Sequence, residues 1–237
     1  MTLKQEDKKY KLLIVGDENI GKTSILKRFI TDKYSSIYEP TIGLDVQSFK
    51  IMIDNQAVFL MSFDISGQNK FNILIPLYSN NADIILLIYD ITKYASFNNM
   101  ENWIYLLNIH NKNCIIGLIG NKLDLEHNRK VEKKEAKNFA DKKNFFFHEV
   151  SALNGDGIKE LFSNILSEQI KKKFILKEMH LNQIEEKFGI NNDDDDIVPI
   201  YIENEDKNTE KIRNANKMTE KEEDQKGLCK CVECLIF

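Results

Sequence analysis

The 237-residue sequence predicts an α/β fold: a doubly wound, mostly parallel six-stranded sheet with one antiparallel edge strand. Two observations support this prediction. Short apolar runs alternate with segments of helical periodicity, and two of the runs are separated by Asp54-Asn55, which predicts a hairpin. Helices that follow successive strands form crossover connections, so the strands between them run parallel and the helices cover both faces.

The elements are expected in a definite order. A buried strand over residues 10–15 ends at Gly16 and precedes a helix over 23–30. Two segments of alternating hydrophobicity, 46–53 and 58–63, form the hairpin. Three later strands each precede a helix; the strands are expected at 84–89, 114–119 and 145–150, and the helices near 96–108, 132–142 and 158–173.

Composition divides the chain into an N-terminal extension (1–7), a folded domain (8–172) and a tail (173–237). The last helical pattern can continue to residue 190. The tail holds 16 acidic and 10 basic side chains, and residues 191–227 contain few apolar ones. Such a segment cannot bury enough apolar surface to offset its chain entropy, so we expect disorder. Its aspartate run at 193–196 is interpreted as a solvated spacer. A calcium site is the alternative, but the run lacks the glycine and glutamate placement of an EF-hand loop.

Charge, hydropathy and cysteine usage narrow the possible functions. The formal net charge of -4 gives no indication of nucleic-acid binding. We expect neither a signal peptide nor a membrane-spanning helix, because no apolar run approaches about 20 residues. Cys114 lies in the body of the chain, whereas the other cysteines occur within the last nine residues, a distribution typical of a cytosolic protein. A zinc site at that end would lack a fourth ligand.

A glycine-rich segment after the first strand matches the phosphate-loop motif G-x-x-x-x-G-K-[ST]. Glycines let backbone N–H groups converge on an anion, and the helix that follows adds the positive end of its dipole. Lys22 is expected to contact the β- and γ-phosphates, and the Thr23 hydroxyl to hold Mg²⁺. The predicted phosphate-binding residues are Gly16, Asp17, Glu18, Asn19, Ile20, Gly21, Lys22, Thr23 and Ser24.

Two further segments indicate guanine recognition. Asn121-Lys122-Leu123-Asp124 follows a predicted strand, and the Asp124 carboxylate can accept hydrogen bonds from the N1–H and the exocyclic amine of guanine. Adenine does not offer that pair, and a site built on paired polar groups rejects the wrong base. Ser151-Ala152-Leu153 follows the last strand and can offer a backbone N–H to the guanine O6.

A fourth motif, Asp64-Ile65-Ser66-Gly67-Gln68, follows the second hairpin strand. Asp64 is expected to contact Mg²⁺, and the Gly67 N–H to reach the γ-phosphate. Each motif is weak alone, but four in this order at strand ends favour a guanine-nucleotide site. A nucleotide kinase is an alternative that would require an acceptor site and several lid arginines, whereas the chain has three arginines.

These segments make the chain resemble a Ras-superfamily GTPase, and within it the Rab family, over residues 8–172. The segments that carry the resemblance are GDENIGKTSILKRF, YEPTIGLD, FDISGQ, LLIYDIT, IGNKLDL and FHEVSAL. The resemblance implies that Tyr34 stacks on guanine and that Thr41 binds Mg²⁺ and the γ-phosphate. It also implies that Gln68 orients the attacking water and that the loop at 66–78 is the second switch. The phrase LIPLY is similar to Rabs of the Golgi branch.

The family implies a cycle between GTP and GDP with Mg²⁺. Hydrolysis is expected to be slow without a GTPase-activating protein, because the switch segments contain no arginine. Effector proteins would bind the GTP state, and an exchange factor would replace bound GDP by GTP. Glu18 departs from the small or neutral residue usual at this position in relatives. Ser66 stands where relatives usually have Ala, and Asn69 where they usually have Glu. A guanine-nucleotide scaffold with hydrolysis disabled by Glu18 is therefore the alternative function.

The C-terminal residues Cys234-Leu235-Ile236-Phe237 fit a prenylation motif, for which a terminal Phe favours geranylgeranyl. One lipid gives reversible binding, and an acidic tail gains little from anionic lipid, so Cys229 and Cys231 are candidates for a second lipid. A prenyl transferase and its escort and extraction proteins are the implied partners. The expected location is the cytoplasmic face of intracellular membranes, Golgi or other endomembrane, with a cytosolic pool.

Overall fold

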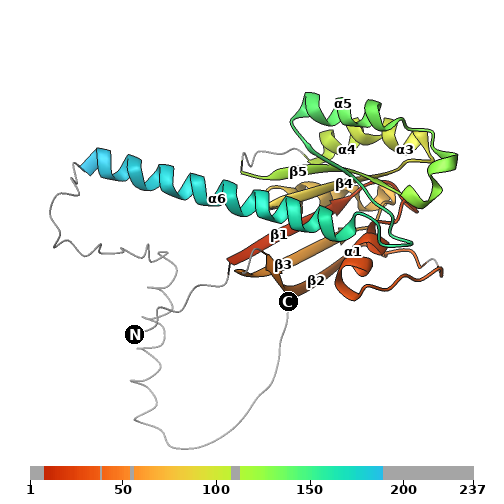
Figure 1. The fold of residues 1–237 in the computed structure, drawn as a ribbon, viewed down its shortest axis with the longest axis horizontal. Helices are drawn as coiled ribbons and strands as arrows, with labels where there is room; N and C mark the ends of the chain where they lie inside the picture. The colour runs from red at the N-terminus through yellow and green to blue at the C-terminus, as the bar shows by residue number, and fades with distance from the viewer. Residues whose placement is uncertain (1–7, 38, 54–55, 108–112, 189–237) are drawn as a thin grey trace, which may run out of the picture. The chain divides into compact units, whose positions relative to one another are not determined.

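The computed structural model describes residues 8–37, 39–53, 56–107 and 113–188 (Figure 1). They form a six-stranded sheet of order β2-β3-β1-β4-β5-β6, in which β2 pairs antiparallel with β3 and the other neighbours pair parallel. This confirms the predicted fold class. The strands are β1 (Lys8–Val15), β2 (Leu44–Ile53), β3 (Gln56–Ile65), β4 (Ile84–Asp90), β5 (Ile115–Asn121) and β6 (Phe146–Glu149).

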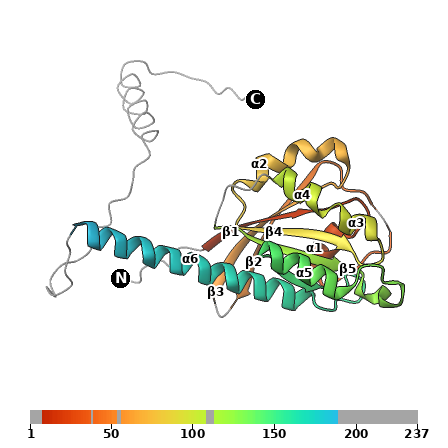
Figure 2. The ribbon, with the colours of Figure 1, turned by 90° about the horizontal axis from the view of Figure 1, so that it is seen from above.

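Helices cover both faces of the sheet, as Figures 1 and 2 show together. Alternate residues along a strand face opposite sides, so Ile14 packs toward α1 and α6, whereas Leu13 packs toward α2, α3, α4 and α5. The central strand β4 is buried along its whole length because both faces are covered. The helices are α1 (Lys22–Thr31), α2 (Ile75–Ser79), α3 (Tyr94–Asn98), α4 (Met100–Leu107), α5 (Lys133–Lys143) and α6 (Ile158–Phe188), with 3₁₀ turns η1 (Asn69–Leu74) and η2 (Leu123–Asn128).

The structure differs from the predicted elements in the segment expected as one helix over 96–108. Two helices, α3 and α4, meet there at Asn99. Asn99 has ψ -4°, away from regular α-helix, and its side chain donates a hydrogen bond outside the helices, to Asp17. The short elements α2, η1 and η2 were not predicted, because they are too short to show a helical period. The hairpin turn at 54–55 lies outside the described residues.

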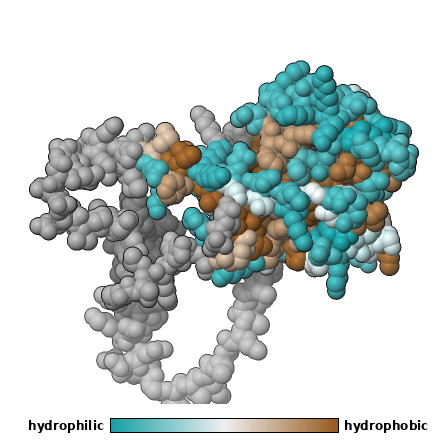
Figure 3. Space-filling model, in the orientation of Figure 1, coloured by the Kyte–Doolittle hydropathy of each residue, from teal (hydrophilic) through white to brown (hydrophobic). Residues whose placement is uncertain are grey.

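Helix α6 continues to Phe188, within the extension to residue 190 that the sequence allows and beyond Lys173. Figures 1 and 2 show that it extends past the end of the sheet. Apolar side chains stay exposed there (Phe174 56%, Ile175 55%, Met179 54%), and apolar colour appears on this stretch in Figure 3. Among the described residues, none of the helices is both long and apolar enough to cross a membrane. The predicted disorder from residue 191 and the three C-terminal cysteines lie outside the described residues.

Candidate nucleotide-binding site

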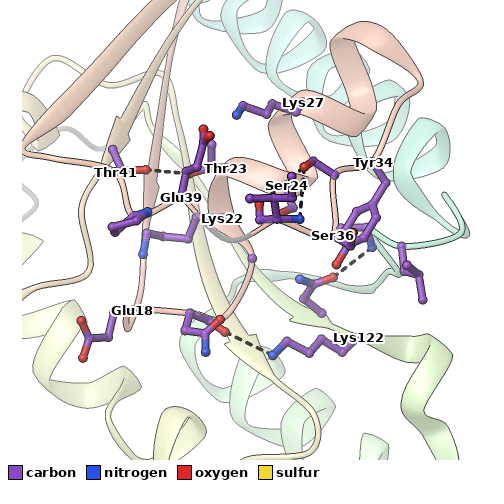
Figure 4. A pocket seen from close by; sticks show the side chains of 18 of the residues that line it. Glu18, Lys22, Thr23, Ser24, Lys27, Tyr34, Ser36, Glu39, Thr41 and Lys122 are labelled. Carbon is purple, nitrogen blue, oxygen red and sulfur yellow. Dashed lines mark hydrogen bonds between the residues drawn. The ribbon is translucent and has the colours of Figure 1, made fainter.

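The carboxyl ends of the parallel strands meet at one edge of the sheet, and the predicted motifs lie there. They surround a cavity of about 470 Å³, a size typical of small-ligand sites. Figure 4 shows Tyr34 and Lys122 at one end of this cavity, and Lys22, Thr23 and Thr41 at the other. The predicted residues that line it are Glu18, Asn19, Gly21, Lys22, Thr23, Ser24, Tyr34, Thr41, Gly67, Gln68, Asn121, Lys122, Asp124, Ala152 and Leu153.

The other predicted residues are not part of the cavity lining. Ile20, Asp64 and Ser151 are buried. The carbonyl oxygen of Gly16 accepts a hydrogen bond from the Lys22 ammonium. Asp17 turns its carboxylate toward helix α4 instead of toward the cavity. Lys27, Lys33, Ser36 and Glu39 line the cavity although the sequence did not single them out.

The backbone of the phosphate loop requires small or permissive residues. Gly16 has φ 142°, Gly21 φ 92° and Asn19 φ 58°, all in the region that disfavours most side chains. A Cβ atom on Gly16 would lie 2.3 Å from the carbonyl oxygen of Ile88, and one on Gly21 would lie 2.4 Å from Nδ2 of Asn121. Gly21 precedes α1 and has no side chain to cap it, so the first N–H groups of the helix are available to a phosphate.

Lys22 is held inside this loop. Its ammonium donates to the carbonyl oxygens of Gly16 (2.9 Å) and Asp17 (2.7 Å). Only 6% of the residue is exposed, and the resulting desolvation lowers its pKa from 10.5 to about 8, against the opposing charges of Asp64, Asp17 and Glu18. A bound phosphate would add negative charge beside the ammonium and favour its protonated form.

Three oxygen-bearing side chains converge next to Lys22. The hydroxyl groups of Thr23 and Thr41 are 2.9 Å apart, and Thr23 donates a hydrogen bond to Oδ2 of Asp64. The second oxygen of Asp64 is buried without a hydrogen-bond partner, and burial raises the pKa of this carboxyl above its usual value. A buried carboxylate oxygen beside two hydroxyls fits Mg²⁺, which binds one or two carboxylates together with phosphates and water.

The end of the cavity that Asp124 lines, predicted to hold the base, is built from three loops tied together by Asn121. Its Nδ2 donates to the carbonyl oxygen of Ile20 (2.7 Å), and its Oδ1 accepts from the N–H of Ala152 (3.2 Å). Asp124 accepts a hydrogen bond from the Ser151 hydroxyl while remaining part of the cavity wall. The loop after β5 is thereby joined both to the phosphate loop and to the loop after β6.

The second switch segment lies directly against the phosphate loop. A Cβ atom on Gly67 would lie 2.3 Å from the backbone carbon of Asp17 and from the backbone nitrogen of Glu18. Gln68 lines the cavity beside it. Near this segment, Val46 pairs with Phe63 across β2 and β3, and the rings of Phe63 and Tyr78 are 5.1 Å apart.

Four residues that sequence reasoning missed support these loops. Asp90 pairs with Lys122 at 2.7 Å, while Asn99 and Trp103 donate to Asp17 at 2.6 and 2.7 Å. Arg28 donates to the carbonyl oxygens of Ala152 (3.0 Å) and Leu153. The contacts of Arg28, Asn99 and Trp103 join positions at least 82 residues apart, and no local pattern indicates such pairs.

Comparison with known proteins agrees with this geometry. The family model described as the Ras family matches residues 11–171. The Ras-related proteins RABA1e and RABA1g of Arabidopsis thaliana are 34% and 36% identical over 160 residues, which cover 67% of this chain and 74% of each relative. The Ras-related protein Rab11B of Nicotiana tabacum is 35% identical over 163 residues, which cover 68% of this chain and 75% of that protein.

The chain therefore belongs to the Ras family, whose members are small GTPases. Within that family it is a GTPase of Rab type. This confirms the resemblance found in the sequence. Membership implies guanine-nucleotide binding, regulators and effectors as partners, and a role in vesicle traffic at intracellular membranes.

Proposed function

We propose that this protein is a switch that hydrolyses GTP to GDP and phosphate and controls vesicle traffic through its two nucleotide states. The observation that carries the proposal is the convergence of Lys22, Thr23, Thr41 and Asp64 at one end of a cavity whose other end is lined by Asp124. The test is purification, identification of the bound nucleotide and single-turnover hydrolysis. Equal competition by ATP and GTP would contradict guanine specificity.

Each group has a definite task in the proposed reaction. Lys22 and the N–H groups at the start of α1 neutralise the phosphate oxygens, and Gln68 holds a water in line with the γ-phosphate. Thr23, Thr41 and Asp64 would hold Mg²⁺, which supplies charge neutralisation of the β- and γ-phosphate oxygens when bound. Thr41 and Gly67 contact the γ-phosphate, and loss of that phosphate would release both switch segments.

One observation favours the alternative of a guanine-nucleotide scaffold with impaired hydrolysis. Glu18 lines the cavity, and its charge acts on the pKa of Lys22. A carboxylate at this place adds negative charge where the γ-phosphate and the attacking water would lie, which disfavours a charged transition state.

Replacing Glu18 by serine is expected to raise the intrinsic single-turnover rate of GTP hydrolysis about 3- to 10-fold, because it removes that repulsion. Affinity for GDP should change little. The variant Glu18→Gln keeps the size and removes the charge, so it should behave like Glu18→Ser. If both variants hydrolyse GTP at the wild-type rate, the charge of Glu18 does not limit turnover.

Anchoring by lipid at Cys234 is the proposed route to membranes, with Cys229 and Cys231 as sites of a second lipid. We expect Cys234→Ser to move the protein almost wholly into the soluble fraction, because later lipid steps depend on first reaching a membrane. Changing Cys229 and Cys231 together to Ser should release only part of it. Cell fractionation measures the membrane-bound share of each variant, and intact-mass analysis of the C-terminal peptide shows which cysteines carry lipid. An unmodified Cys234 in membrane-bound protein would rule out this anchor. The cytoplasmic face of Golgi or other endomembranes is the proposed location, with a cytosolic pool.

A further inference from the structure

The carboxylate of Asp17 is bound by side chains from outside the phosphate loop. Its Oδ1 accepts hydrogen bonds from Nδ2 of Asn99 (2.6 Å) and Nε1 of Trp103 (2.7 Å). Both donors come from the α3–α4 segment, where Trp103 is 2% exposed and its helix neighbours Met100 and Leu107 are fully buried against the sheet. Because the helix is fixed by packing, its two donors hold the Asp17 side chain in one orientation.

The main chain of Asp17 takes part in the site itself. Its carbonyl oxygen accepts the second hydrogen bond of the Lys22 ammonium, and its backbone contacts Gly67 of the second switch segment so closely that a Cβ there would not fit. Fixing the Asp17 side chain therefore fixes a carbonyl that orients Lys22 and the surface on which Gly67 rests. The same contacts turn a negative charge away from the phosphate end of the cavity.

We propose that Asp17, Asn99 and Trp103 form a positioning triad that holds the phosphate loop in its nucleotide-binding shape and thereby slows nucleotide release. The inference rests on the proposed guanine-nucleotide function. Glycine at two of the loop's three positive-φ positions gives the free loop more backbone freedom to lose, and ordering it only when ligand binds would weaken binding. Two donors on a carboxylate, each a charge-assisted hydrogen bond, are strong enough to keep the loop ordered beforehand.

The measurement is release of a fluorescent GDP analogue from the full chain with Mg²⁺ present. Asp17→Ala should release it about 10- to 100-fold faster, since it removes the acceptor of both charge-assisted hydrogen bonds, whose loss reaches the nucleotide only through the loop. Trp103→Phe keeps an aromatic ring but lacks the N–H, and Asn99→Ala lacks the amide; each should give about 3- to 10-fold faster release. Asn98→Ala, an exposed neighbour, is the matched control and should release the analogue at the wild-type rate.

Two readouts separate positioning from a merely structural role. Combining Asp17→Ala with Trp103→Phe should give no faster release than Asp17→Ala alone, because the second donor has then lost its acceptor. The preference for GDP over ADP should persist, since the contacts of Asp124 are untouched. Lower melting temperatures with release rates within twofold of wild type would overturn the triad. Failure of the wild-type protein to bind GDP would instead overturn the proposed function. If Asp17→Ala does not fold, the release rates of Asn99→Ala and Trp103→Phe still test the triad.

Discussion

Replacing Asp124 by asparagine is expected to weaken GDP binding about 100- to 10,000-fold and to let the protein accept xanthine nucleotides. The Asp124 carboxylate presents acceptors at the base end of the cavity, and two hydrogen bonds to a charged group contribute about 1.5–3 kcal/mol each. The amide of asparagine offers one acceptor and one donor. Xanthine has a carbonyl where guanine has its exocyclic amine, so the new donor finds a partner there.

The structure indicates that Asp124→Asn keeps the loop in place. Asp124 accepts the Ser151 hydroxyl through Oδ1, and the carbonyl oxygen of asparagine can accept the same bond. Glu126→Gln is the matched control: it makes the same chemical change two positions along η2, at an exposed carboxylate paired with Arg129, and should leave base preference unchanged. Competition of GDP, xanthosine diphosphate and ADP for a fluorescent nucleotide measures the effect. Unaltered guanine preference in Asp124→Asn would remove this residue from base recognition.

The fold was predictable because its signals are local. A strand buried on both faces, such as β4, appears in the sequence as a continuous apolar run, and the edge strand β2 shows the alternation of a half-covered face. That the four motifs lie together was predictable for a related reason. Each motif follows a strand directly, and parallel strands bring their carboxyl ends to one edge of the sheet. Sequence order alone therefore placed Lys22 near Asp64 and Asp124 near Ser151.

The contacts that hold the loops in position were not predictable in this way. Asn99 and Trp103 meet Asp17 across 82 and 86 positions, and Arg28 reaches Ala152 across 124. Nothing in helical periodicity distinguishes these donors from ordinary helix residues. The break between α3 and α4 was missed for the same reason, since the side chain at the break donates to Asp17 of the phosphate loop, 82 positions away.

Gln68→Leu is expected to slow intrinsic GTP hydrolysis about 10- to 100-fold while leaving GDP affinity within about twofold. In-line attack needs a water held by a polar side chain, and misplacement of a reactant by about 1 Å can cost 100-fold. Gln68 lines the cavity beside Gly67, which rests on the phosphate loop. Leucine has similar size but can neither donate to nor accept from that water.

Nucleotide binding should survive the Gln68→Leu change because the structure attaches Gln68 to its surroundings through the main chain. Its N–H donates to the Ser66 hydroxyl at 3.4 Å, and its carbonyl accepts from the N–H of Phe71 at 2.9 Å. Gln56→Leu, the same substitution at the exposed start of β3, should hydrolyse GTP at the wild-type rate. Single-turnover phosphate release from protein preloaded with GTP provides the comparison. A Gln68→Leu protein that binds GTP and hydrolyses it as fast as wild type would assign the positioning of water to another residue.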